Sequence, residues 1–218
     1  MTNIELEFKR IIEGLAGELI SIDSKLELLF HMDKKLRKDA LDELNISPAF
    51  FGLTIDSLKT DTIISLSRFF ENKRQTQNIF HLLEFVHKNL SLFSQESFKN
   101  RTGVTELLYP QQQITLKTVT QHKKELAEVN SILKNLHFWR NKRYAHLERQ
   151  FFYEPLELTS KAPLRYTDLR RLIKLAGQIL NTYLVAFEDR SNTFRATNLC
   201  DVDTVIDILK KYRQSLIK

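Results

Sequence analysis

Residues 167–187 read TDLRRLIKLAGQILNTYLVAF, and this stretch decides the fold class. Its apolar side chains recur every three or four positions, the spacing that gathers them on one side of an α-helix. Thr167 precedes the first of them and is a suitable N-cap. The apolar stripe consists of Leu169, Leu172, Ile173, Ala176, Ile179, Leu180, Tyr183, Leu184 and Phe187. The stretch therefore predicts a long helix that buries this one side in a core.

The same apolar period extends over most of the chain. It predicts helices over about residues 4–29, 48–70, 76–90, 113–136 and 202–216, with a short helical turn at 39–44. Ser47 and Pro48 open the second of these, because proline is tolerated in the first turn of a helix. Residues 91–112 and 151–166 lack the period and contain prolines, so we expect connections without regular structure there.

Composition agrees with a helical protein. The 218 residues include only 5 Gly and 4 Pro, too few for the many turns of a β-sheet protein. Hydrophobic residues make up 42% of the chain, which is enough to fill a sizeable core and argues against disorder. We expect an all-α fold: a single antiparallel helical bundle over residues 1–218, built on three or four long helices with extra short ones.

Cysteine content and hydropathy indicate a compartment. The one cysteine, Cys200, cannot form an intramolecular disulfide, which favours a reducing environment. The N-terminal MTNIELEFKR has no signal-peptide pattern, and no stretch approaches the roughly 18 apolar residues of a membrane span. We therefore expect a cytoplasmic protein without a membrane partner. The net charge of +6 is compatible with a polyanion such as a nucleic acid.

The most chemically specific segment is WRNKRYAHLER at residues 139–149. It brings an arginine, an asparagine and a histidine close together in sequence. Arg140 can hold a phosphate and oppose charge on its oxygens, and Asn141 can orient the phosphate or the histidine. His146 can exchange protons near neutral pH. The nearby cations that can contact the phosphates of a nucleic acid are Lys134, Lys142, Arg143 and Arg149.

The order R-N-x-x-x-x-H resembles the signature of the HEPN superfamily, and RNKRYAH at residues 140–146 looks like its abortive-infection branch. The resemblance implies an endoribonuclease of bacterial defence or of a toxin system, with Arg140, Asn141 and His146 as catalytic residues. The RNA 2'-hydroxyl would attack the adjacent phosphate, leaving a 2',3'-cyclic phosphate and a 5'-hydroxyl. No cofactor and no metal are implied, and the sequence has no HExxH, no paired cysteines and no aspartate cluster near His146.

The resemblance also implies partners. RNA is the expected substrate, and HEPN nucleases commonly build their site at the two-fold interface of a homodimer. An antitoxin or another regulatory protein is a possible further partner. Glu148 stands where many HEPN toxins carry a tyrosine that the antitoxin modifies, so regulation by that route is not expected.

Helix geometry restricts how the motif can work. At about 100° per residue, Arg140 and His146 lie roughly 120° apart around a regular helix and about 9 Å apart along it, so they do not share a face. Three possibilities are open. The helix bends within the motif, or the site is completed across a dimer interface, or Arg143 is the working arginine, since it lies three residues before His146.

A structural interpretation of the same residues is also open. Arg140 can pair with an acidic side chain such as Glu148 or Glu188. His146 can be an interior histidine, and Asn141 can end a helix. For the whole protein, the alternative is a non-catalytic HEPN-like helical module that binds a nucleotide, an RNA or a partner protein.

Overall fold

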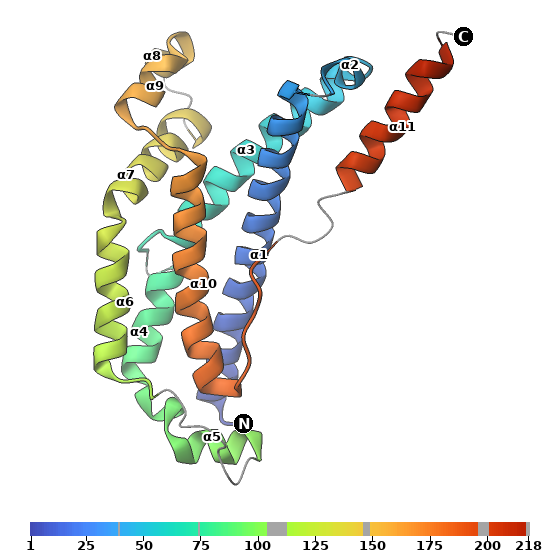
Figure 1. Cartoon of the computed structure of the whole chain (residues 1–218). Coiled ribbons are helices and arrows are strands. Elements are labelled where there is room, and N and C mark those ends of the chain that lie inside the picture. Colours follow the sequence, from blue (N-terminus) through green and yellow to red (C-terminus); the bar gives the residue numbers. More distant parts are fainter. Residues whose placement is uncertain (39, 74, 104–112, 146–148, 196–200, 217–218) are drawn as a thin grey trace.

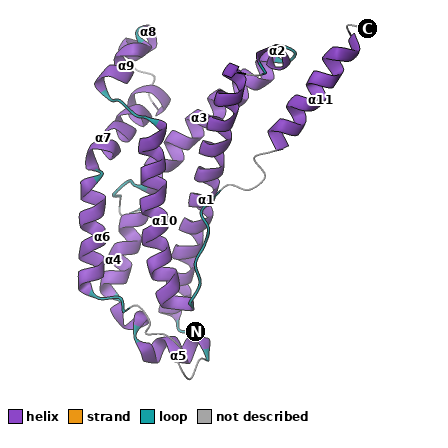
Figure 2. Cartoon of the chain, viewed as in Figure 1, coloured by secondary structure: helices purple, strands orange, loops and turns teal. Residues whose placement is uncertain are grey.

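The computed structural model describes residues 1–38, 40–73, 75–103, 113–145, 149–195 and 201–216. Within these ranges the chain forms helices and loops and no strand, which confirms the expected all-α class (Figures 1 and 2). The longer helices are α1 (Asn3–Lys38), α3 (Pro48–Phe69), α4 (Ile79–Lys88), α6 (Leu116–Glu128), α7 (Asn130–Trp139), α10 (Tyr166–Glu188) and α11 (Asp201–Leu216). The short elements are α2 (Leu41–Leu44), η1 (Leu90–Phe93), α5 (Gln95–Thr102), η2 (Arg140–Ala145), α8 (Arg149–Tyr153) and α9 (Pro155–Lys161).

Helix α10 lies between α1 and α6 and supplies much of the core (Figure 1). All nine residues of its predicted apolar stripe are buried. The ring of Phe187 lies 4.6 Å from that of Phe8 in α1, centroid to centroid. Full burial of a side chain of this size contributes about 1.5–3 kcal/mol. Thr167 is not the N-cap: Arg165 takes that position, and the Asp168 carboxylate accepts a hydrogen bond from its backbone N–H at 2.9 Å.

The predicted helix over 113–136 is divided in two at Val129. This residue has φ −99° and ψ 10°, which ends α6 and allows α7 to begin at Asn130. The division has a packing reason, because α6 contacts α4 and α10 whereas α7 contacts α3. Helix α7 also continues beyond residue 136, to Trp139, where the motif segment begins.

Two segments expected to lack regular structure contain helices, so those predictions are wrong. In 91–112, α5 begins after Ser94, whose hydroxyl accepts the Ser97 N–H at 3.2 Å, and ends at Gly103 with φ 72°. In 151–166, Pro155 is the first residue of α9 rather than an interruption. The N–H groups in the first turn of a helix have no partner within the helix. Proline, which has no N–H, is therefore well tolerated at this position.

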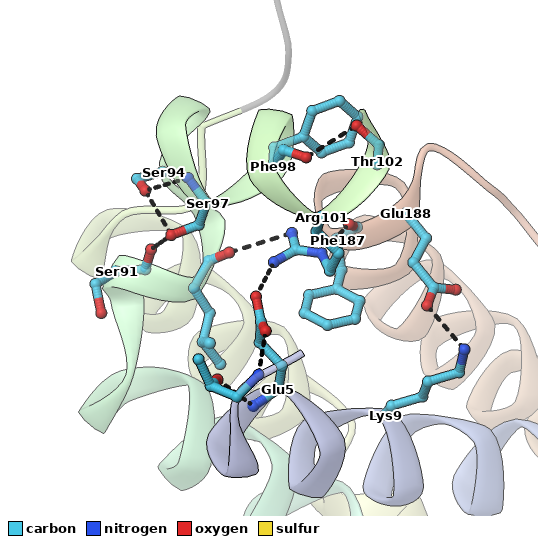
Figure 3. Close-up of polar contacts among 12 residues, drawn as sticks. Glu5, Lys9, Ser91, Ser94, Ser97, Phe98, Arg101, Thr102, Phe187 and Glu188 are labelled. Atoms are coloured by element: carbon cyan, nitrogen blue, oxygen red, sulfur yellow. Dashed lines mark hydrogen bonds and ion pairs between the residues drawn. The ribbon is translucent and has the colours of Figure 1, made fainter. Parts of the chain in front are cut away.

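One buried arginine fastens α5 to the bundle (Figure 3). The guanidinium of Arg101 donates to the Phe187 carbonyl at 2.8 Å, to the Leu92 carbonyl at 3.3 Å and to Glu5 at 3.0 Å. It also lies 3.7 Å from the centroid of the Phe187 ring. The Arg101 side chain is 5% exposed, so these contacts are nearly dry, and its fork of donors joins α5 to three other elements, α1, η1 and α10.

The far end of α1 and the C-terminal helix form a second, smaller unit. Helix α1 is longer than expected, running to Lys38, and buries Met32 in a cluster with Leu44 and Phe51. Helix α11 packs on this cluster and is held by an Asp203–His31 contact of 2.9 Å. None of the helices in the described ranges is long and apolar enough to cross a membrane.

Candidate active site

The backbone changes geometry within the motif. Helix α7 ends at Trp139, and residues Arg140–Ala145 form a π-helical turn. Such turns are rare and occur frequently at functional sites, because the wider ring of the hydrogen bonds redirects the side chains that follow. A regular helix through the motif, which would hold Arg140 and His146 about 120° apart, is therefore not what the chain forms over 140–145.

An ion pair fixes the side chain of Arg140. Its Nη2 lies 2.6 Å from Oε1 of Glu71, which follows the end of α3, and Nζ of Lys73 lies 2.8 Å from the same oxygen. Burial opposes ionisation of Glu71, but the hydrogen bonds from Lys73 and Arg140 outweigh it and lower the pKa of this carboxyl. Arg140 and Glu71 are only 21% and 15% exposed, so the pair is sheltered from solvent.

Within the described residues the acidic partner of Arg140 is Glu71, which the sequence did not suggest. Glu188 pairs instead with Lys9 at 3.2 Å and with Arg190 at 2.8 Å, and Glu148 lies outside the described residues. The Nε atom of Arg140 is buried and has no hydrogen-bond partner among the described residues. A buried donor of this kind is costly unless something completes its contacts.

A histidine one turn before Arg140 belongs to the same polar cluster. Nδ1 of His137 and Oγ of Ser67 are 2.7 Å apart, and this hydrogen bond ties α7 to α3. Burial lowers the pKa of His137, and the positive charges of Arg140 and Lys73 lower it further, against an opposing effect of Glu71. His137 therefore favours its neutral form beside the arginine.

The remaining predicted site residues are spread around the end of α7. Asn141 is exposed in the π-helical turn, and Lys142 and Arg143 are partly exposed there. Lys134 is exposed on α7 and Arg149 is exposed at the start of α8. His146 lies outside the described residues, as do Leu147, Glu148 and Cys200. The structure thus brings Arg140 to Glu71 and His137, and leaves the other cations toward solvent.

Two members of this cluster were missed from the sequence. His137 precedes Arg140 by three residues, so it shares a helix face with it, and that spacing was a usable signal. Glu71 had no such signal, because 69 positions separate it from Arg140 and only the packing of α3 on α7 joins them. Within the described ranges, no three His, Cys, Asp or Glu side chains gather as a metal site.

The described part of the chain is thus a helical bundle in which residues 140–145 of the R-N-x-x-x-x-H motif form a π-helical turn. Comparisons with curated proteins and with solved structures gave no match. The model of the HEPN family described as AbiU2 matches residues 5–201, which is most of the chain. The protein therefore belongs to the AbiU2 family, in the abortive-infection branch of the HEPN superfamily.

Proposed function

We propose that this chain is a metal-independent endoribonuclease that acts in the cytoplasm in a bacterial defence or toxin system. The observation that carries the proposal is the R-N-x-x-x-x-H motif in the sequence of an AbiU2-family chain, in which Arg140 lies in a π-helical turn and pairs with Glu71. The products are a 2',3'-cyclic phosphate and a 5'-hydroxyl, formed by attack of the RNA 2'-hydroxyl on its own phosphate.

Each residue of the motif has a chemical task in this reaction. A guanidinium has five N–H donors, and Glu71 takes one of those on Arg140, so others remain for phosphate oxygens as charge builds on them. His146 moves the proton of the attacking or the leaving oxygen. Asn141, which is exposed, orients the phosphate or the imidazole. The RNA strand is held by Lys134, Lys142, Arg143 and Arg149.

The active form in this proposal is a homodimer in which the motifs of two chains meet. Its support is membership of the HEPN superfamily, whose nucleases commonly build their site at a two-fold interface. Mixing two inactive variants tests it. If Arg140 of one chain works with His146 of the other, equal amounts of Arg140→Ala and His146→Ala exchange subunits and recover about one quarter of wild-type activity, because half of the dimers are mixed and each holds one intact site. A mixture that stays inactive after verified subunit exchange would contradict the composite site.

The choice between two arginines is tested in the same assay. Arg143 is partly exposed, so it can contact a phosphate, whereas Arg140 is engaged by Glu71. We expect Arg140→Ala to reduce kcat/KM by about 100-fold or more, the scale of losing one transition-state donor. Arg143→Ala should act mainly through RNA affinity. Arg190→Ala, an exposed arginine of an ion pair outside the motif, is the control. Equal losses for Arg140→Ala and the control would refute the role of Arg140.

The second candidate function is a non-catalytic HEPN module that binds a nucleotide, an RNA or a partner protein. The observation that favours it is the Arg140–Glu71 pair, since an arginine held by a carboxylate can serve the fold alone. Labelled tRNA, rRNA and mRNA incubated with the protein in EDTA separate the two functions. Cleavage lost in His146→Ala supports the nuclease, whereas RNA binding without cleavage of any of them supports the module.

A further inference from the structure

A pocket beside the motif has no assigned role. It lies between α1, α3 and the end of α7 and extends to the start of α10, with a volume of about 400 Å³. Its apolar floor is formed by leucine and isoleucine side chains of α1, α3 and α10. One wall is Trp139, the residue directly before Arg140, so its Cα lies about 3.8 Å from that of the phosphate-binding candidate.

Aromatic side chains in fixed positions line this pocket. The indole Nε1 of Trp139 donates to the Ala162 carbonyl at 2.7 Å, which sets the orientation of its ring. Phe30 stacks on Tyr166 with ring centroids 4.0 Å apart and an interplanar angle of 14°. The Tyr166 hydroxyl in turn donates to Glu27. Flat rings that are already held in place suit a flat ligand, because stacking then costs little conformational entropy.

Polar groups at the pocket define which flat ligand fits. Two carboxylates, Asp33 and Asp56, line it together with Lys59, whose Nζ lies 5.7 Å from the centroid of the Trp139 ring. Thr62 lines the inner wall, is 1% exposed, and its hydroxyl has no hydrogen-bond partner among the described residues. Carboxylates accept hydrogen bonds from amino groups, and the hydroxyl can donate or accept.

We propose that this pocket binds an RNA base that carries an exocyclic amino group, next to the phosphate that is cleaved. The inference rests on the proposed nuclease function and adds a base preference to it. Adenine, cytosine and guanine present an amino group to a carboxylate, whereas uracil presents none. A phosphate does not suit this pocket, because two carboxylates and one lysine give it a net negative charge.

The single tryptophan of the chain reports directly on this pocket. Adenosine, cytidine, guanosine and uridine are titrated into the full chain while Trp139 fluorescence is followed. Nucleosides have no phosphodiester, so binding is measured without cleavage. We expect saturable quenching by the three amino-bearing nucleosides and at least about tenfold weaker binding of uridine, equivalent to one good hydrogen bond. No saturable quenching, or equal quenching by uridine, overturns the proposal.

Matched variants locate the effect. Asp56→Asn removes a carboxylate of the pocket and should weaken adenosine binding by about fivefold or more, whereas Asp61→Asn, on the same helix but outside the pocket lining, should not. An equal effect of the two variants contradicts the assignment. If nucleosides bind but RNA is not cleaved, the nuclease proposal fails and the base-binding pocket stands. If RNA is cleaved but nucleosides do not bind, the pocket proposal fails and the nuclease stands.

Discussion

Arg140 and Glu71 form an ion pair with 2.6 Å between Nη2 and Oε1, and this pair joins the motif segment to the end of α3. Lys73 approaches the same oxygen at 2.8 Å, so one carboxylate holds two cations. Because both partners of the pair are largely sheltered, the arginine is oriented before any substrate arrives. Preorganised donors of this kind stabilise charge without rearranging during the reaction.

Glu71→Gln should reduce RNA cleavage while leaving the protein folded. The amide keeps the size of the side chain but removes the charge that orients Arg140, and misplacement of a catalytic donor costs about tenfold to 100-fold in kcat/KM. The measurement is kcat/KM together with the urea midpoint. Lys73→Met is the control, because it leaves the Arg140–Glu71 contact intact. A lower urea midpoint with unchanged kcat/KM would assign the pair to stability alone.

Acid should destabilise the fold through two histidines. Burial lowers the pKa of His122, although the charge of Glu125 opposes this effect. Burial also lowers the pKa of His137, and the positive charge of Arg140 lowers it further. In the unfolded chain a histidine has a pKa of about 6.5, so below that pH the unfolded state binds more protons and the free energy of unfolding falls. The loss begins near that pH and continues down through the lowered pKa values.

His122→Gln tests this pH dependence. Nδ1 of His122 lies 2.8 Å from the hydroxyl of Tyr183, which a glutamine amide can also reach, and glutamine does not titrate. Urea unfolding at several pH values between about 7 and 5 should show a flatter decline for His122→Gln than for the wild type. Identical slopes for His122→Gln and the wild type would refute the account of His122.

Arg101→Met should be strongly destabilising. It removes the charged partner of Glu5 and the donors of two backbone carbonyls, and breaking a buried pair from one side costs about 3–5 kcal/mol. Arg101→Lys keeps the charge but not the fork of donors, so it should lose less. Denaturant unfolding measures both variants. A loss below about 1 kcal/mol for Arg101→Met would show that α5 does not depend on this arginine.

Gly177 should tolerate alanine only when Phe194 is shortened. A Cβ at Gly177 would lie 2.8 Å from Cδ2 of Phe194, too close for the ring to stay in place. Alanine alone should therefore destabilise by about 1–3 kcal/mol. In a Phe194→Ala background the same change should stabilise by about 0.5–1 kcal/mol, the usual preference of a helix for alanine over glycine. Gly14→Ala has open space around its Cβ and serves as the control. A gain from Gly177→Ala in the wild-type background would contradict the packing of Phe194.

The helical core could be predicted from the sequence because the apolar repeat of each helix lies within one contiguous stretch of residues. The stripe from Leu169 to Phe187 repeats with the helix period, and every member is buried. The break at Val129 could not be predicted, because it depends on α6 and α7 contacting different partners. Helix α9 was missed because Pro155 suggests a break, yet proline at the first helical position is favourable.

The candidate site was predictable only in part. Its motif is contiguous, so Arg140 and Asn141 could be chosen from the order of residues alone. The partner of Arg140 could not, since Glu71 reaches it only through the packing of α3 on α7. The pocket at Trp139 could not be predicted either, because most of its lining residues come from four helices that are distant in the sequence.

The central claim is cleavage of RNA by the motif without a metal ion. Its most direct measurement is the chemistry of the RNA ends produced in EDTA by the wild type, Arg140→Ala and His146→Ala. The account predicts 2',3'-cyclic phosphate and 5'-hydroxyl ends from the wild type and none above background from either variant. Ends of another kind, cleavage abolished by EDTA, or unchanged cleavage by His146→Ala would contradict it.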